Sequence, residues 1–101
     1  MKQVNEHQEE CLNILQEECA EVIQAASKIK RFGLVGKRET DTLTNLHHLE
    51  IELGDVLALV DLCLNSSLGL SRENIQLAKT AKLAKLPRYM HTWESDPELN
   101  Q

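Results

Sequence analysis

The sequence is poor in aromatic residues and lacks any long apolar run. Phe, Tyr and Trp make up 3% of the 101 residues, whereas Leu, Ile, Val and Ala are abundant. This composition favours packing of helix on helix, and no segment shows the alternating pattern of a strand. No apolar run approaches the ~20 residues that a membrane-spanning helix needs. We therefore expect an all-α protein that does not cross a membrane.

Cysteines are few and the charge balance is acidic. There are three cysteines, Cys11, Cys19 and Cys63, with no Cys-x-x-Cys step, and no signal peptide opens the chain. An odd cysteine count in this context predicts small buried thiols in a reducing, cytoplasmic environment. The formal net charge of −5 argues against nucleic acid or an anionic membrane as a partner, because phosphate neutralisation needs clustered Lys and Arg.

The length allows one small domain. We predict a domain over residues 1–91, followed by an acidic C-terminal tail over residues 92–101. A domain of this size has a thin core, so self-association would contribute to its stability.

Three helices are expected: two long antiparallel ones and a shorter third, in a small bundle completed by oligomerisation. The first runs from about Val4 to Arg31 and is stopped by Phe32-Gly33 and Gly36. The second begins after a cap at Thr44 or Asn45 and ends near Asn65. The third starts after an N-cap at Ser71, without a full capping box, and ends at Pro87. An exposed, mobile loop is expected over residues 33–43.

The first helix carries an apolar stripe at helical spacing, and we expect this stripe to face the core. Its members are Val4, Cys11, Leu15, Cys19, Val22, Ala26 and Ile29, and Leu12 and Ile23 widen it.

Two acid-x-x-acid steps stand out, Glu18-Cys19-Ala20-Glu21 and Glu52-Leu53-Gly54-Asp55. Residues three apart share a helix face, so each pair can bind one ion or two adjacent ions. At about 100° per residue, Glu52 and Asp55 fall where an amphipathic helix would place leucine. Glu18 falls at the edge of the apolar stripe, and Glu21 lies one step outward.

Carboxylates are rarely buried unless they are paired or bind a metal. A buried ion pair with Lys or Arg is one alternative for Glu52 and Asp55, and a solvated face is the usual explanation for Glu21 alone. Four convergent carboxylates repel one another, which raises pKa values unless cations are present. A di-iron site would need Glu-x-x-His steps, and the chain has none. The oxygen-only set therefore favours Mg²⁺, with Mn²⁺ as the alternative.

At these residues the chain resembles the MazG-like all-α nucleoside triphosphate pyrophosphohydrolases. The family pattern Glu-Glu-x-x-Glu, followed after a loop by Glu-x-x-Asp, is matched by Glu17-Glu18-Cys19-Ala20-Glu21 and Glu52-Leu53-Gly54-Asp55. Asn65 lies where many members have an asparagine, and residues 82–89 are similar to the family's basic ending. The resemblance covers roughly Leu12 to Tyr89.

The resemblance implies hydrolysis of a nucleoside or deoxynucleoside triphosphate to the monophosphate and pyrophosphate. It implies metal ligands at Glu18, Glu21, Glu52 and Asp55, with Glu17 or Glu18 activating the attacking water. A single copy of the motif further implies a homodimer or a dimer-of-dimers tetramer. Two alternatives stay open: a non-catalytic helical oligomerisation or adaptor module, and a related phosphohydrolase acting on a phosphoribosyl-nucleotide.

Basic and histidine side chains near the acidic pairs have two interpretations. Cations at a helix end interact favourably with the helix dipole, but they also suit contacts to phosphate. His48 precedes Glu52 by one helical turn, so it either hydrogen-bonds that carboxylate or is a surface or capping residue. The predicted substrate-binding residues are Lys28, Arg31, Asn65, Lys82, Lys85 and Arg88. Base specificity is not predicted, because the N-terminal region has His7 and no aromatic residue.

Overall fold

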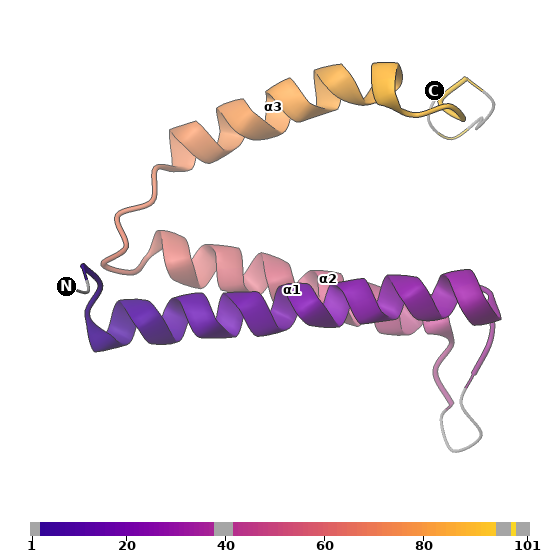
Figure 1. The fold of residues 1–101 in the computed structure, drawn as a ribbon, viewed down its shortest axis with the longest axis horizontal. Helices are drawn as coiled ribbons and strands as arrows, with labels where there is room; N and C mark the ends of the chain where they lie inside the picture. The colour runs from indigo at the N-terminus through magenta and orange to yellow at the C-terminus, as the bar shows by residue number, and fades with distance from the viewer. Residues whose placement is uncertain (1–2, 38–41, 95–97, 99–101) are drawn as a thin grey trace. The chain divides into compact units, whose positions relative to one another are not determined.

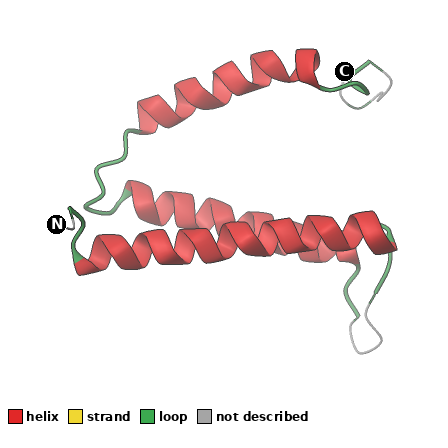
Figure 2. Cartoon of the chain, viewed as in Figure 1, coloured by secondary structure: helices red, strands yellow, loops and turns green. Residues whose placement is uncertain are grey.

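The computed structural model describes residues 3–37, 42–94 and 98, and every regular element among them is a helix. Helix α1 spans Glu6–Phe32, α2 spans Asn45–Leu64 and α3 spans Arg72–Tyr89 (Figures 1 and 2). The all-α prediction is thus confirmed. The chain divides into two compact units, Met1–Gly69 and Leu70–Gln101, which are described separately. Among the described residues, no helix is both long enough and apolar enough to span a membrane.

The first unit is an antiparallel pair of helices. Near the start of α1, the Gln8 side chain donates a hydrogen bond of 2.8 Å to the carbonyl of Ser67, just beyond the end of α2. At the opposite end, the backbone N–H of Asn45 donates to the carbonyl of Gly36 at 2.8 Å. Figure 1 shows α1 and α2 side by side over their length. The predicted pair of long antiparallel helices is therefore confirmed.

Local sequence sets the ends of these helices. Asn5 caps α1 and exchanges hydrogen bonds with Gln8, forming a capping box that the sequence analysis missed because Gln replaces Glu. Gly33 ends α1 with φ of 89°, a conformation that favours glycine. Thr44 caps α2 by accepting a bond from the His47 N–H, as one of the two predicted alternatives.

The two helices meet along a narrow seam in which successive residues are alternately four and three apart. Cys11, Ala25, Asn45 and Cys63 are its buried members. Between them lie half-buried side chains at the same spacing, namely Leu15, Glu18, Val22 and Ile29 on α1 and Leu49, Glu52, Val56 and Leu59 on α2. This spacing averages about 3.5 residues per turn, as in a coiled coil. Two seam positions are therefore occupied by glutamate.

The predicted stripe is wrong at five positions, because Val4, Leu12, Cys19, Ile23 and Ala26 are exposed. The stripe and the seam share Cys11, Leu15, Val22 and Ile29, but between these residues the seam passes through Glu18 and Ala25 in place of Cys19 and Ala26. The prediction of buried thiols is accordingly confirmed for Cys11 and Cys63 and wrong for Cys19. Burial, followed by the influence of Cys11, raises the pKa of the Cys63 thiol.

The second unit consists of α3 and the residues after it. Ser71 caps α3 by accepting a bond from the Asn74 N–H at 3.1 Å, as predicted. The predicted stop at Pro87 is wrong, because the helix continues to Tyr89 and the Met90 N–H still bonds to the Leu86 carbonyl. A proline in the last turn removes one hydrogen bond but leaves few residues to disrupt. Most of the predicted acidic tail, residues 92–101, lies outside the described residues.

The connection after α1 is folded back onto the start of α2. The Asn45 side-chain amide donates to the carbonyl of Gly33 at 3.0 Å, and the Leu46 N–H donates to the carbonyl of Leu34 at 3.0 Å. A Cβ on Gly36 would lie 2.8 Å from the amide nitrogen of Asn45, so only glycine fits there. Residues 33–37 are thus fixed against α2, whereas residues 38–41 of the predicted mobile loop lie outside the described residues.

Candidate metal centre

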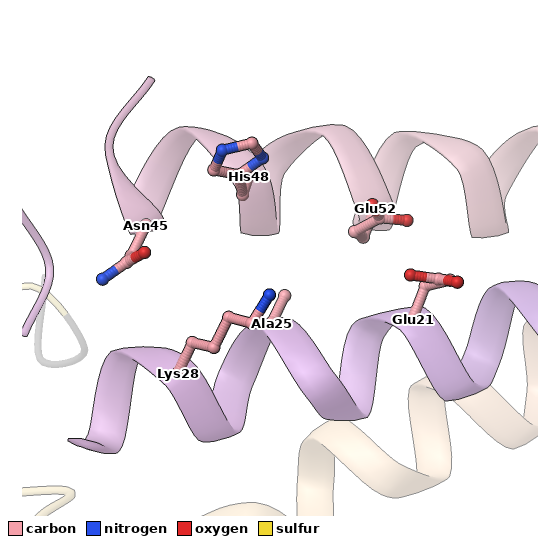
Figure 3. A pocket seen from close by; sticks show the side chains of 6 residues that line it. All are labelled: Glu21, Ala25, Lys28, Asn45, His48 and Glu52. Carbon is pink, nitrogen blue, oxygen red and sulfur yellow. The ribbon is translucent and has the colours of Figure 1, made fainter. Parts of the chain in front are cut away.

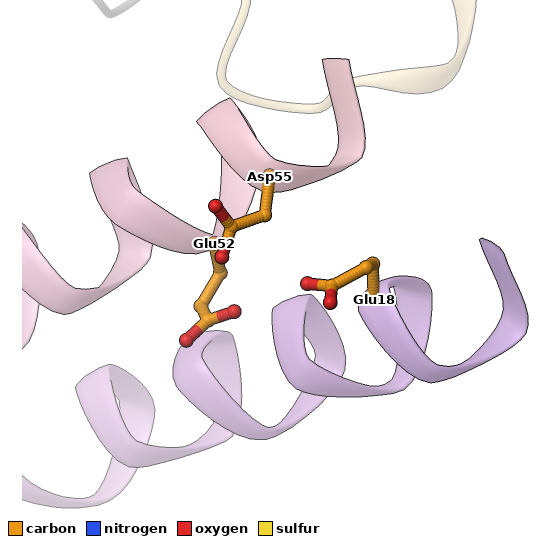
Figure 4. Close-up of side chains that lie close together, drawn as sticks. All are labelled: Glu18, Glu52 and Asp55. Atoms are coloured by element: carbon orange, nitrogen blue, oxygen red, sulfur yellow. The ribbon is translucent and has the colours of Figure 1, made fainter. Parts of the chain in front are cut away.

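Three carboxylates from the two helices converge on one point. Glu18 of α1 and Glu52 and Asp55 of α2 each place an oxygen within 4.8 Å of the others (Figure 4). Glu18 and Glu52 are half-buried because they occupy the seam, and Asp55 is exposed at its edge. Asp55 is therefore more exposed than its angular position on the helix predicts, although its carboxylate points toward those of Glu18 and Glu52.

Within this triad, Glu18 is the residue whose carboxyl pKa is raised. Desolvation, and then repulsion by Asp55, Glu52, Glu21 and Glu17, raise the pKa of its carboxyl group. The charges that raise it all belong to neighbouring carboxylates. A cation bound among these oxygens would reverse the effect.

Glu21 lies beside the triad and faces Glu52 across a small cavity. The cavity measures about 50 Å³ and is lined by Glu21, Ala25, Lys28, Asn45, His48 and Glu52 (Figure 3). Figure 3 shows the carboxylates of Glu21 and Glu52 at one end, Asn45 at the other, and the Lys28 ammonium between them beside Ala25. One water needs ~10–15 Å³, so the cavity has room for a hydrated ion or part of a phosphate. Glu52 is the carboxylate common to the triad and the cavity.

The donor set fits a hard divalent cation. Ligands at ~2.1 Å around octahedral Mg²⁺ lie about 3.0–4.2 Å apart, so oxygens within 4.8 Å need only a small rotamer adjustment. The donors are all carboxylate oxygens, a set suited to Mg²⁺ or Mn²⁺. Glu18, Glu52 and Asp55, with Glu21 across the cavity, are the residues that would hold it.

The remaining predicted residues of this unit lie at different distances from the triad. Lys28 lines the cavity, and its side chain extends along α1 (Figure 3). Glu17 is exposed next to Glu18. Arg31 places its guanidinium over the Phe32 ring, 4.9 Å from the centroid. Asn65 caps α2 and donates to the Asp61 carbonyl at 2.9 Å, about 15 Å of helix away from Asp55.

Three predicted substrate-binding residues belong to the second unit. Lys82, Lys85 and Arg88 are three residues apart on α3 and therefore share one face of that helix. The Lys82 ammonium lies over the Tyr89 ring, 5.6 Å from its centroid. Their role toward a substrate stays a prediction.

Sequence reasoning missed Asn45 and Phe32 as residues that shape the site. Asn45 is 7% exposed and is the one buried polar side chain among the described residues. The sequence signal for Asn45 was its spacing, because Asn45, Leu49, Glu52 and Val56 follow one another at intervals of four, three and four residues. Phe32 was treated as part of a helix stop, yet it borders a second cavity next to the first.

The family comparison agrees with the all-helical fold. The model of the MazG nucleotide pyrophosphohydrolase domain matches residues 6–89, which include all three helices. The chain belongs to this family of nucleotide pyrophosphohydrolase domains. Searches of curated proteins and of solved structures each found no match.

Proposed function

We propose that this protein hydrolyses a nucleoside or deoxynucleoside triphosphate to the monophosphate and pyrophosphate, with Mg²⁺ as its metal and Mn²⁺ as a substitute. The observation that carries the proposal is the convergence of Glu18, Glu52 and Asp55 from two helices, in a chain of the MazG family. Like charges gathered in a seam destabilise a small fold, so a bound cation and an anionic substrate explain why they are there.

Each side chain has a definite task in this scheme. Glu18, Glu21, Glu52 and Asp55 would hold the metal, which would offset triphosphate charge and make the attacking water easier to deprotonate. Glu17 or Glu18 accepts the proton of the attacking water. Lys28, whose ammonium lies between Asn45 and the two glutamates of the cavity, contacts the phosphate chain.

The test is a panel of NTPs and dNTPs with Mg²⁺, scored for pyrophosphate against phosphate release. Reaction in ¹⁸O-labelled water places the label in the monophosphate if water attacks the α-phosphorus. Glu52→Gln and Asp55→Asn should each lower kcat/KM by at least about a thousandfold, since each removes a metal ligand.

Glu50→Gln and Asp61→Asn are matched controls, because both residues are exposed on α2 outside the triad. They remove the same charge from the same helix and should leave turnover near the wild-type value. Full activity of Glu52→Gln or Asp55→Asn would refute the metal assignment, and labelled pyrophosphate would refute attack at the α-phosphorus.

We further propose that the active protein is a homodimer or a dimer of dimers. In the first unit α2 exposes apolar side chains away from the seam, including Leu57 at 67% and Leu53 at 46%. A helix that is apolar on several faces is normally covered by another element. Leu57→Asp should shift the protein toward monomer in light scattering, and an unchanged mass would contradict this face as the interface.

A further inference from the structure

A second and larger cavity adjoins the carboxylate cavity in the first unit. It measures about 380 Å³ and is lined by Lys28, Phe32, Gly36, Lys37 and Asn45. Lys28 and Asn45 border both cavities, so the two are neighbours along the groove between α1 and the start of α2. The smaller cavity is acidic at its Glu21 and Glu52 end, whereas the larger one is bordered by two lysines and an aromatic ring.

We infer that the larger cavity receives the base of the nucleotide, and that it favours bases whose outer edge presents carbonyl oxygens. These bases are guanine, hypoxanthine, uracil and thymine. The inference rests on the proposed function, since it assumes that the phosphates are bound next to Glu18, Glu52 and Asp55.

The order of groups along the groove matches that of a nucleotide. Phosphates belong at the carboxylates, where a bound cation would hold them, and Lys28 follows as a second phosphate contact. Beyond Lys28 the groove opens into the larger cavity, which has the size of a small-molecule site. A base linked to those phosphates through its sugar is the group that extends in this direction.

Phe32 provides an aromatic surface for the base. It is the last residue of α1 and its side chain is 62% exposed, although a ring of this size is normally covered. The Arg31 guanidinium lies over one face of the ring and restrains its orientation, and Arg31 is not among the residues that line the cavity. The ring therefore keeps apolar surface for stacking with a base, which is favourable for every base.

Selectivity comes from the Lys37 ammonium group. Lysine donates hydrogen bonds and accepts none, so Lys37 pairs with the O6 or N7 acceptor of guanine or the O4 acceptor of thymine and uracil. Adenine and cytosine present amino donors at the same edge, which would face like donors. The Asn45 amide nitrogen is already used, since it donates to the Gly33 carbonyl and fixes the cavity wall.

The experiment measures kcat/KM for dGTP, dITP, dUTP and dTTP against dATP and dCTP, each with Mg²⁺. We expect at least a fivefold preference for the first four, the lower end of what a good base contact gives. Lys37→Gln should remove most of this preference and Lys37→Arg should retain it. Lys30→Gln is the matched control, because Lys30 is an exposed lysine in the last turn of α1 and does not line the cavity.

Phe32→Leu separates stacking from selectivity. It should raise KM for all six substrates by about fivefold, because stacking does not distinguish bases, and it should leave the ratio between them unchanged. Phe32 and Lys37 are exposed, so loss of folding is not expected for these variants.

A second measurement keeps this inference separable from the proposed function. Calorimetry with α,β-methylene analogues of dGTP and dATP in Mg²⁺ reports binding without turnover. Tighter binding of the dGTP analogue, lost in Lys37→Gln, supports the base site even if no triphosphate is hydrolysed. Preference for dATP or dCTP, equal use of all six, or a Lys37→Gln variant with unchanged ratios would overturn the inference.

Discussion

Replacing Glu52 by glutamine should stabilise the metal-free protein and abolish its response to Mg²⁺. Glutamine has the shape of glutamate but lacks its charge, so it leaves the packing of the seam unchanged. Two opposite effects on stability are thus expected from one substitution, depending on whether the cation is present. A carboxylate that served only in a stabilising ion pair would give the reverse result in the metal-free protein.

The magnitude follows from the spacing of the triad. Two unit charges 4.8 Å apart repel by about 0.9 kcal/mol at the dielectric constant of water and by about 3.5 kcal/mol at an effective value of 20. Lys28 lines the same cavity as Glu52 and offsets part of this repulsion. We therefore expect a net gain of about 1 kcal/mol, which corresponds to about 4–8 °C in the unfolding midpoint.

Thermal unfolding in chelator and in Mg²⁺, followed by circular dichroism, measures both effects. Wild-type protein should gain stability with Mg²⁺, since a ligand of the folded state raises the midpoint. Glu50→Gln removes an equal charge from the exposed side of α2, so it controls for the net charge of −5. About 1 M salt should shrink the difference in chelator, because it screens the repulsion. A Glu52→Gln variant less stable than wild type in chelator would refute this reasoning.

Three further outcomes follow from the same structure. Because the pKa of Glu18 is raised, the folded state binds its proton more tightly than the unfolded state. Metal-free stability should therefore fall as pH rises above about 4.3, and Glu18→Gln should flatten that dependence in urea titrations at successive pH values. Asn45→Ala should lower the free energy of unfolding by about 1–3 kcal/mol in the same assay, because it leaves the Gly33 carbonyl without its donor. Gly36→Ala should also destabilise, since its Cβ would meet Asn45 and Phe32 at 2.8 Å, whereas Gly54→Ala has open space and should not.

The sequence was sufficient to predict the helices and to single out the three carboxylates that the structure brings together, Glu18, Glu52 and Asp55. Periodicity and caps placed α1 and α2 to within two residues, because apolar spacing and the Thr44 and Gly33 signals agree. The acidic steps were recognisable because Glu52 occupies a position where an isolated amphipathic helix would carry leucine. The structure brings Glu18 to Glu52 and Asp55, a convergence that spacing along one helix does not establish.

What the sequence could not supply was the exact contact face of α1. Pairing with α2 selects which residues between Leu15, Val22 and Ile29 enter the seam, and this choice depends on the partner helix rather than on α1 alone. Cys19 therefore lies outside the seam and Glu18 inside it. Asn45 donates hydrogen bonds to the carbonyls of Gly33 and Gly36, which are 12 and 9 positions away, so no local sequence pattern predicts these contacts.

Glutamates in the seam favour a cation site over a purely structural pair of helices. A two-helix unit has few contact positions, and leucine at 18 and 52 would bury more apolar surface than glutamate does. Glutamate at these positions lowers the stability of a unit with few contacts, and desolvation followed by repulsion from nearby carboxylates raises the pKa of Glu18. A non-catalytic oligomerisation module would gain stability by losing these charges, whereas a cation site needs all of them. Comparing the stability of Glu18→Leu and Glu52→Leu with their turnover therefore decides between the two, since greater stability with activity lost is the outcome expected of an enzyme.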